Sequence, residues 1–145
     1  MIFGSESDII EKEYEIFISI RNTIKMNIRI LQELSDIISI IDSLYSLSEV
    51  AFKYDYCRPK INTDGIIDIK NGRHPVIESF LNSSNEFIPN DSNIGQENNL
   101  VQIITGPNMS GKSTYIRQLA LIVILAQIGS FVPSDSANIS IVDRI

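Results

Sequence analysis

Residues 106–113 read Gly-Pro-Asn-Met-Ser-Gly-Lys-Ser and fit the phosphate-binding P-loop pattern GxxxxGK[ST]. In this pattern Gly106 and Gly111 let the backbone fold closely around a polyphosphate, so that successive N–H groups point inward. Lys112 reaches the β- and γ-phosphates, and the hydroxyl of Ser113 is a ligand for Mg²⁺. The spacing therefore predicts that a nucleoside triphosphate binds here.

The flanks of this loop predict the strand and the helix that a P-loop requires. Residues 100–105 (LVQIIT) form a short apolar run that ends at Gly-Pro, which is typical of a buried strand. Residues 113–128 contain neither Gly nor Pro, and Gly129 follows at the position of a helix C-cap. This helix would direct its N-terminal N–H groups toward the phosphates. A chance glycine-rich turn is the alternative to a P-loop.

The predicted helix also needs a test for membrane insertion, because residues 119–128 are almost wholly apolar. Arg117, Gln118 and Gln127 bound this apolar stretch, which is shorter than the about 20 residues that a bilayer span needs. We therefore expect the helix to pack against a sheet and expect no membrane partner.

Composition predicts one domain of ordinary globular character. The chain has 145 residues, 43% of them hydrophobic, and a formal net charge of −6. An acidic chain is a poor DNA grip by itself, because phosphate neutralisation needs clustered Lys and Arg. The single cysteine, Cys57, cannot form an internal disulfide, and an inert, partly buried thiol is its simplest interpretation. No basic signal segment follows Met1, so we expect a cytoplasmic protein.

Residues 8–56 contain neither Gly nor Pro, and their apolar residues recur at helical spacing. They predict one long helix or two nearly collinear helices. Apolar steps of four and three run from Ile10 to Leu31, with Arg21 as one polar step, and continue one register later from Ile30 to Ala51. A rod of this kind would extend for roughly 70 Å and would need partners along its side. The Arg58-Pro59 pair is expected to stop it.

The remainder of the chain predicts short strands separated by turns. A short strand is expected over residues 66–69, and the turn pair Asn71-Gly72 leads into the cluster Gly72-Arg73-His74-Pro75. His74 is the only histidine, and a structural, hydrogen-bonded role is favoured over catalysis, since no second base accompanies it. Residues 82–99 predict a polar loop with one apolar anchor. Residues 137–144 alternate like a second strand of the same sheet.

Several of these stretches together resemble one family. The P-loop with its particular residues, TGPNMSGKSTYIRQLAL, followed by AQIGSFVPSDSANISIVDRI, closely resembles the ATPase domain of the MutS family of DNA mismatch repair proteins. The upstream pieces RPKI, DIKNGRHPVIE and FIPND stand in the order and at about the spacing that this family shows. The resemblance covers residues 11–145. The bacterial-type members are most similar, because nuclease-linked paralogues usually have Thr for Met109 and Gly for Ser110.

The resemblance implies an α/β fold, with a long helical arm (residues 1–57) entering the first half of a P-loop NTPase sheet domain (residues 58–145). It also implies ATP and Mg²⁺ as cofactors, with Ser113 as the magnesium ligand. The aromatic residue that stacks on adenine in the family corresponds to Phe87, although Phe87 is equally consistent with a plug that anchors a polar loop. The residues that the resemblance assigns to the nucleotide are Gly106, Pro107, Asn108, Met109, Ser110, Gly111, Lys112, Ser113 and Thr114, with Phe87 and Ile88 beside the base.

The resemblance also sets limits on activity. No Asp-Glu pair follows the P-loop before Ile145, so the catalytic carboxylates of the family are expected outside this sequence, together with its DNA-reading and dimerising parts. We therefore expect at most nucleotide binding from this chain, as part of an ATPase that couples ATP to mismatch recognition. Mismatched double-stranded DNA and a second subunit, identical or paralogous, are the implied partners through those other parts. A cytoplasmic, nucleoid-associated or organellar location is compatible. The alternatives are a stand-alone nucleotide-binding module and a non-functional structural remnant.

Overall fold

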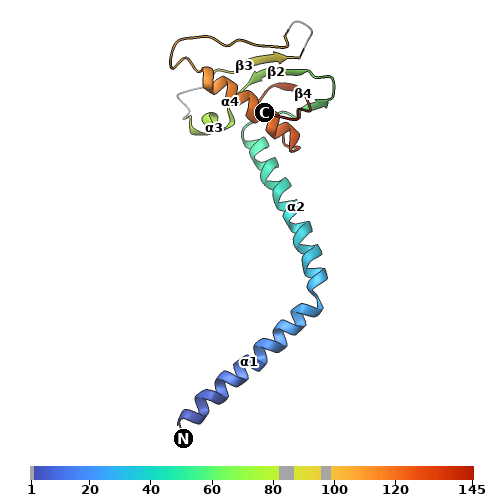
Figure 1. The fold of residues 1–145 in the computed structure, drawn as a ribbon, viewed down its shortest axis with the longest axis vertical. Helices are drawn as coiled ribbons and strands as arrows, with labels where there is room; N and C mark the ends of the chain where they lie inside the picture. The colour runs from blue at the N-terminus through green and yellow to red at the C-terminus, as the bar shows by residue number, and fades with distance from the viewer. Residues whose placement is uncertain (1, 82–86, 96–98) are drawn as a thin grey trace. The chain divides into compact units, whose positions relative to one another are not determined.

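The computed structural model describes residues 2–81, 87–95 and 99–145, with side chains from Asp8 onward. It is a mixed α/β structure whose helices and strands are labelled in Figure 1. The chain forms two compact units, Met1–Leu44 and Tyr45–Ile145, which divide within the second helix. The domain boundary between residues 57 and 58 stays a prediction from sequence. Within the described ranges, no helix is both long and apolar enough to cross a membrane.

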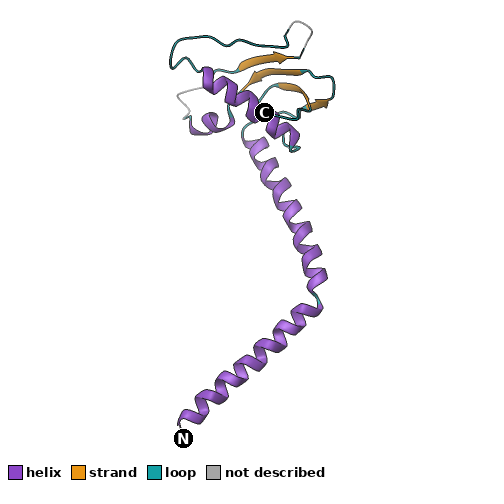
Figure 2. Cartoon of the chain, in the orientation of Figure 1, coloured by secondary structure: helices purple, strands orange, loops and turns teal. Residues whose placement is uncertain are grey.

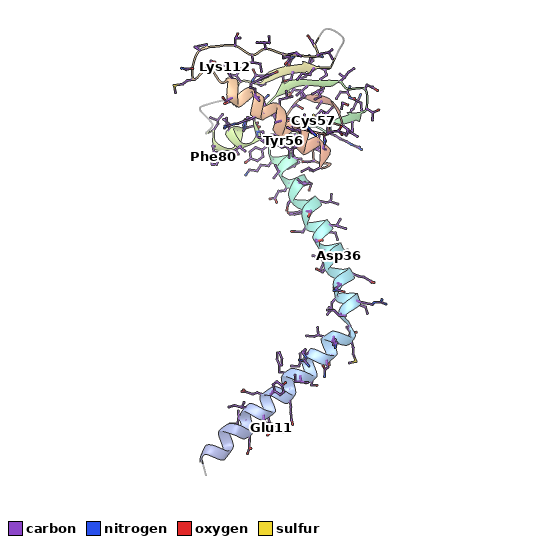
Figure 3. All side chains as sticks on the ribbon, in the orientation of Figure 1. Glu11, Asp36, Tyr56, Cys57, Phe80 and Lys112 are labelled. Carbon is purple, nitrogen blue, oxygen red and sulfur yellow. The ribbon has the colours of Figure 1, made fainter. Side chains whose placement is uncertain are left out.

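The first unit is helical and contains a break at Asn27. Helix α1 runs over Ile2–Met26 and helix α2 over Ile28–Lys53, so the structure has the predicted pair of helices and not one helix. The Asn27 N–H bonds to Ile24 O at 3.0 Å, and its side-chain amide donates to Thr23 O at 2.9 Å. Asn competes with the helix in this way for backbone acceptors, which explains the interruption. The side chains of both helices are drawn in Figure 3, where Glu11 and Asp36 are labelled.

Helix α2 ends earlier than the sequence predicts. Residue Asp55 adopts a left-handed conformation with φ of +52°, and Tyr56 N donates to Ala51 O at 2.9 Å. This hydrogen bond is the long bond of a Schellman C-cap, which closes the helix at Lys53. Cys57 then forms an isolated antiparallel bridge with Val132. The prediction that the helix continues to the Arg58-Pro59 pair was therefore wrong, because a local cap acts before the proline does.

Four strands form one mixed sheet in the order β1-β4-β2-β3. Strand β4 pairs in parallel with β1 and antiparallel with β2, and β2 pairs antiparallel with β3. The predicted strands at residues 66–69 and 137–144 are present, with shifted ends. Their bounds are Lys60–Asn62 for β1, Ile67–Gly72 for β2, Asn90–Ile94 for β3 and Ser136–Ser140 for β4.

Two predictions about strands were wrong. Strand β3, with the polar sequence NDSNI, lies in the stretch that was expected to be a loop. The segment 100–105, which was expected to be a buried strand, is drawn as loop in Figure 2 and pairs with none of the described strands. Val101 and Ile103 are 80% and 86% exposed. Strand formation depends on a hydrogen-bonded neighbour, which an apolar sequence alone does not supply.

Helix α4 (Lys112–Gln127) covers the sheet as the sequence predicts. Its buried residues Ile122, Val123 and Ala126 pack with Ile69 of β2 and Ile139 of β4 in a single hydrophobic core. The opposite face of the helix is less covered. This packing fixes the direction of α4 and so the place of the loop at its N-terminus.

Candidate functional site

The loop of residues 106–111 has the backbone conformation of a tight turn before a helix. Met109 has φ of +64° and Gly111, the N-cap of α4, has φ of +86°. Gly106 has φ of +157°, and a Cβ atom built there would lie 2.8 Å from Ser110 Oγ. A side chain at Gly106 would adopt a strained backbone conformation and would force the Ser110 hydroxyl to rotate away. The α4 N-terminus also provides N–H groups that have no acceptor within the helix.

Lys112 folds back across this loop. Its Nζ donates hydrogen bonds to Gly106 O and to Pro107 O, the second at 2.6 Å. The lysine therefore ties the first two residues of the loop to the first turn of α4. An ammonium group in this place carries a positive charge beside the helix N-terminus, where anions are favoured. Figure 3 labels Lys112 beside the start of this helix.

A cavity of about 630 Å³ lies beside the loop. It brings Phe87 and Ile88, which precede β3, together with the loop and the first turn of α4. Ile88 is 81% exposed and Phe87 is half-buried. Asn108, Met109 and Ser113 do not line this cavity. The residues assigned from sequence that do line it are Phe87, Ile88, Gly106, Pro107, Ser110, Gly111, Lys112 and Thr114.

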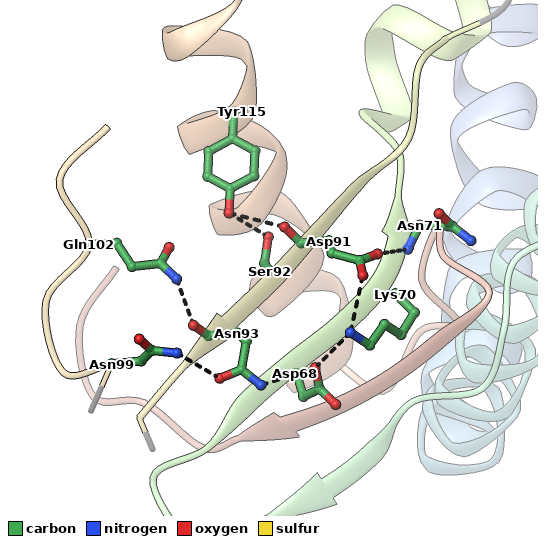
Figure 4. Close-up of polar contacts among 9 residues, drawn as sticks. All are labelled: Asp68, Lys70, Asn71, Asp91, Ser92, Asn93, Asn99, Gln102 and Tyr115. Atoms are coloured by element: carbon green, nitrogen blue, oxygen red, sulfur yellow. Dashed lines mark hydrogen bonds and ion pairs between the residues drawn. The ribbon is translucent and has the colours of Figure 1, made fainter. Parts of the chain in front are cut away.

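Tyr115 lines the site although the sequence pattern assigns no nucleotide contact to it. Its hydroxyl shares a hydrogen bond of 2.8 Å with Ser92 Oγ, which ties α4 to β3 (Figure 4). The Tyr115 side chain also lines the cavity. No local pattern in the sequence identifies this contact, because Ser92 belongs to a strand that the sequence does not predict.

Asp91 anchors the other side of β3. It accepts from Asn71 N at 2.9 Å and from Lys70 Nζ at 3.1 Å (Figure 4). The Asn71 N–H, followed by the Lys70 ammonium group, lowers the pKa of Asp91 below its ordinary value. Lys70 has its pKa raised, first by the hydrogen bond to Asp91 and then by the charge of that carboxylate. The carboxylate is exposed, so this contact orients the β2–β3 pair more than it stabilises it.

His74 and Arg73 have structural roles. His74 is buried, and its Nδ1 accepts from Ile77 N at 3.3 Å as the N-cap of helix α3 (Pro75–Phe80). The predicted structural role of His74 is thus confirmed. The Arg73 guanidinium donates to Tyr54 O and Asp55 O at 2.7 and 3.0 Å, and its Nε lies 2.8 Å from Glu78 Oε1. Arg73 therefore joins the end of α2 to α3.

Glu78 titrates in a poorly solvated position. Burial raises the pKa of Glu78 above its ordinary value, and Arg73 lowers it in part, by its charge and by hydrogen bonding. The second carboxylate oxygen, Oε2, is buried without a hydrogen-bond partner. The ion pair with Arg73 therefore offsets the free-energy cost of burying the Glu78 carboxylate.

Comparison with known proteins identifies the family. A family model described as MutS domain V matches residues 102–145. The DNA mismatch repair protein MutS of Halothermothrix orenii is 50% identical over 145 residues, which are 100% of this chain and 16% of that protein. The MutS of Finegoldia magna is 54% identical over 99% of this chain and 17% of the relative. The MutS of Clostridioides difficile is 50% identical over 99% of this chain and 15% of the relative.

These matches extend over almost every residue of the chain, and they include both the helical arm and the α/β unit. The chain spans about a sixth of the length of the curated relatives. It belongs to the MutS family of DNA mismatch repair proteins.

Proposed function

We propose that the chain carries the nucleotide-binding part of a DNA mismatch repair ATPase, with ATP and Mg²⁺ as its ligands. One observation carries the proposal. Lys112 lies across the loop at the N-terminus of α4, and the same cavity has Phe87 and Ile88 in its wall. A phosphate-binding element and an apolar surface for a base are thus the two parts of one cavity. Its volume of about 630 Å³ is in the range of small-molecule sites.

The residues present fit a bound triphosphate. Gly106 has a backbone conformation that L side chains rarely adopt, and without a side chain there the loop can offer its backbone to a ligand. Lys112 would exchange its carbonyl partners for phosphate oxygens, and Ser113, which is exposed at the start of α4, would ligate Mg²⁺. Phe87 would stack on adenine, with Ile88 beside it. The magnesium ion would neutralise phosphate charge.

Hydrolysis requires more than this site offers. Transfer of the γ-phosphoryl group to water needs carboxylates that hold Mg²⁺ and a group that positions the attacking water. No such pair is assigned to residues of this chain. We therefore propose binding without turnover for the isolated chain. For the longer protein we propose ATP hydrolysis coupled to mismatched duplex DNA, in a dimer with an identical or paralogous subunit.

A titration with a fluorescent ATP analogue in the presence of Mg²⁺ tests the proposal. Loss of the Lys112 ammonium removes a charge-assisted contact, so Lys112→Ala should weaken binding by at least about tenfold. Lys60→Ala removes an equally charged, exposed side chain from β1 and should leave binding within about twofold. Equal affinities for the wild type and Lys112→Ala would disprove the phosphate site and favour the structural remnant.

Competition with inorganic tripolyphosphate separates the two parts of the cavity. Aromatic stacking on a base is worth about 1–3 kcal/mol, so Phe87→Ala should weaken ATP binding by about tenfold. The same variant should bind tripolyphosphate as the wild type does, because that ligand has no base. A loss of both ligands in Phe87→Ala would instead favour the role of a loop anchor for Phe87.

A further inference from the structure

The two sides of the cavity come from segments that are separated in the sequence. Phe87 and Ile88 form the base side, and the loop of residues 106–111 with Lys112 forms the phosphate side. Phe87 is half-buried and Ile88 is 81% exposed, so core packing does little to hold the base side in place. A ligand that contacts both sides binds more tightly when their separation is set before it arrives, because less order is then lost on binding.

Tyr115 connects helix α4 to strand β3 through its hydroxyl group. The hydroxyl donates to Asp91 O at 3.4 Å, and its oxygen lies 2.8 Å from Ser92 Oγ, so it acts as the acceptor toward Ser92 (Figure 4). Ser92 is only 3% exposed, so water does not readily replace Tyr115 as its partner. The contact is therefore a specific attachment between the helix and the strand.

Each end of this attachment continues to one side of the cavity. In α4, Tyr115 N donates to the carbonyl oxygen of the N-cap, Gly111, at 2.9 Å. Strand β3 begins at Asn90, whose Nδ2 donates to Ile88 O at 3.0 Å. A series of short contacts thus runs from the phosphate loop through Tyr115 and Ser92 to the base side.

We propose that Tyr115 is a positioning residue for the nucleotide, an inference that rests on the function proposed above. Its hydrogen bond with Ser92 sets the separation of the base side and the phosphate side, so that one ATP molecule contacts both. The hydroxyl acts through β3 and does not touch the ligand. Its loss leaves each side intact and leaves their separation less well defined, so only a ligand that spans the cavity should be affected.

Titrations with the fluorescent ATP analogue and with inorganic tripolyphosphate test this role. Tyr115→Phe keeps the ring and removes the hydrogen bond, so it should weaken binding of the ATP analogue by about fivefold. It should change the affinity for tripolyphosphate by less than about twofold, because that ligand contacts the phosphate side alone. Tyr45→Phe makes the same chemical change at an exposed tyrosine of α2 and should alter neither affinity.

Ser92→Ala removes the same hydrogen bond from its other end. It should also weaken binding of the ATP analogue by about fivefold, and the double variant with Tyr115→Phe should be no more than about twofold weaker than either single variant. In a Phe87→Ala background, Tyr115→Phe should change the affinity by less than about twofold, since the base side then contributes little. Urea unfolding confirms that each variant is folded, and Ser92→Ala carries the test by itself if Tyr115→Phe does not fold.

Three results would overturn the proposal. The first is an ATP affinity that Tyr115→Phe leaves unchanged. The second is an equal loss of ATP and tripolyphosphate binding, because the tyrosine would then support only the loop. The third is a Ser92→Ala variant with full ATP affinity beside a weakened Tyr115→Phe, because the hydroxyl would then contact the ligand directly. Failure of the proposed function gives a different pattern, in which the wild type and Lys112→Ala have equal affinities.

Discussion

Replacement of Arg73 by methionine should destabilise the α/β unit by an amount that depends on pH. Arg73 donates to two carbonyl oxygens at the end of α2 and forms an ion pair with Glu78. The two side chains are only 16% and 22% exposed, so water does little to replace the lost partner. Methionine retains the apolar stem of the side chain, which limits the change to the charged group.

The expected cost at neutral pH is about 3 kcal/mol. Removal of one partner from a buried ion pair costs about 3–5 kcal/mol, and partial exposure places this pair at the lower end. In the variant, the unpaired Glu78 carboxylate becomes neutral when it binds a proton, which lowers the free-energy cost of its burial. Burial already raises the pKa of Glu78, and loss of Arg73 removes the two effects that lower it. The folded state therefore holds the proton more tightly than the unfolded chain, whose value is about 4.3.

The sign of the pH dependence follows from this difference. Stability linked to a raised carboxyl pKa is present below the unfolded value and is lost as the pH rises through the folded value. The deficit of Arg73→Met should thus be about 1 kcal/mol smaller at pH 5 than at pH 7. Urea unfolding at both pH values, followed by the near-UV circular dichroism of the packed tyrosines, measures this loss of stability. Arg58→Met, at an exposed arginine, should cost less than about 0.5 kcal/mol.

A double variant identifies the partner. Arg73→Met combined with Glu78→Gln should cost at least about 1 kcal/mol less than the sum of the single changes, because no buried charge remains unpaired. A deficit that is equal at pH 5 and pH 7 would refute the assignment of the cost to Glu78. Strict additivity of the two changes would refute it independently.

Three further changes test the core, the sheet and the loop. Ile122→Ala should cost about 2–5 kcal/mol in urea unfolding because its side chain is fully buried, whereas Ile124→Ala on the exposed face of α4 should cost less than about 1 kcal/mol. Asp91→Asn should make the free energy of unfolding fall less steeply on acidification. The lowered pKa of Asp91 contributes stability that is present above the unfolded pKa and is lost as the pH falls through the folded pKa. Urea unfolding measured at a series of acidic pH values tests this difference. Gly106→Ala should weaken binding of the fluorescent ATP analogue by about tenfold, because the strained backbone and the displaced Ser110 hydroxyl change the shape of the loop. Gly129→Ala, at a left-handed position in open space, should lower stability by about 1–2 kcal/mol and leave binding unchanged.

Sequence patterns predicted best the helices, whose formation depends on residues that are close together in the sequence. Helix α4 follows from an apolar run without Gly or Pro, and its packing on the sheet follows from the burial of that run. The break at Asn27 also has a local signal, because the apolar stripe changes register between Ile28 and Ile30. No local pattern predicts the early end of α2, because Asp55 takes the left-handed C-cap position that Gly usually occupies.

Strands were predicted less well because their causes are not local. The polar segment of β3 is a strand since β2 offers it a ladder of backbone partners, and Tyr115 holds it from the side of α4. The apolar segment 100–105 has the stronger strand propensity but no ladder among the described residues. A segment becomes a strand only where another strand offers hydrogen-bond partners. An apolar pattern indicates that the segment is favoured to be buried, but not that such a partner exists.

The same difference determines how firmly the loop of residues 106–111 is held at its two ends. On the side of α4 the loop continues into a helix with Ile122 and Ala126 in the core, so its C-terminal half has a rigid base. On the other side residues 100–105 are attached to β3 chiefly by the hydrogen bond from Gln102 Nε2 to Asn93 O, 2.6 Å long (Figure 4). Lys112 bridges the two halves through its bonds to the carbonyls of Gly106 and Pro107. A ligand that draws Lys112 away from these carbonyls must therefore itself hold the N-terminal half of the loop, which polyphosphate oxygens bonded to the loop N–H groups can do.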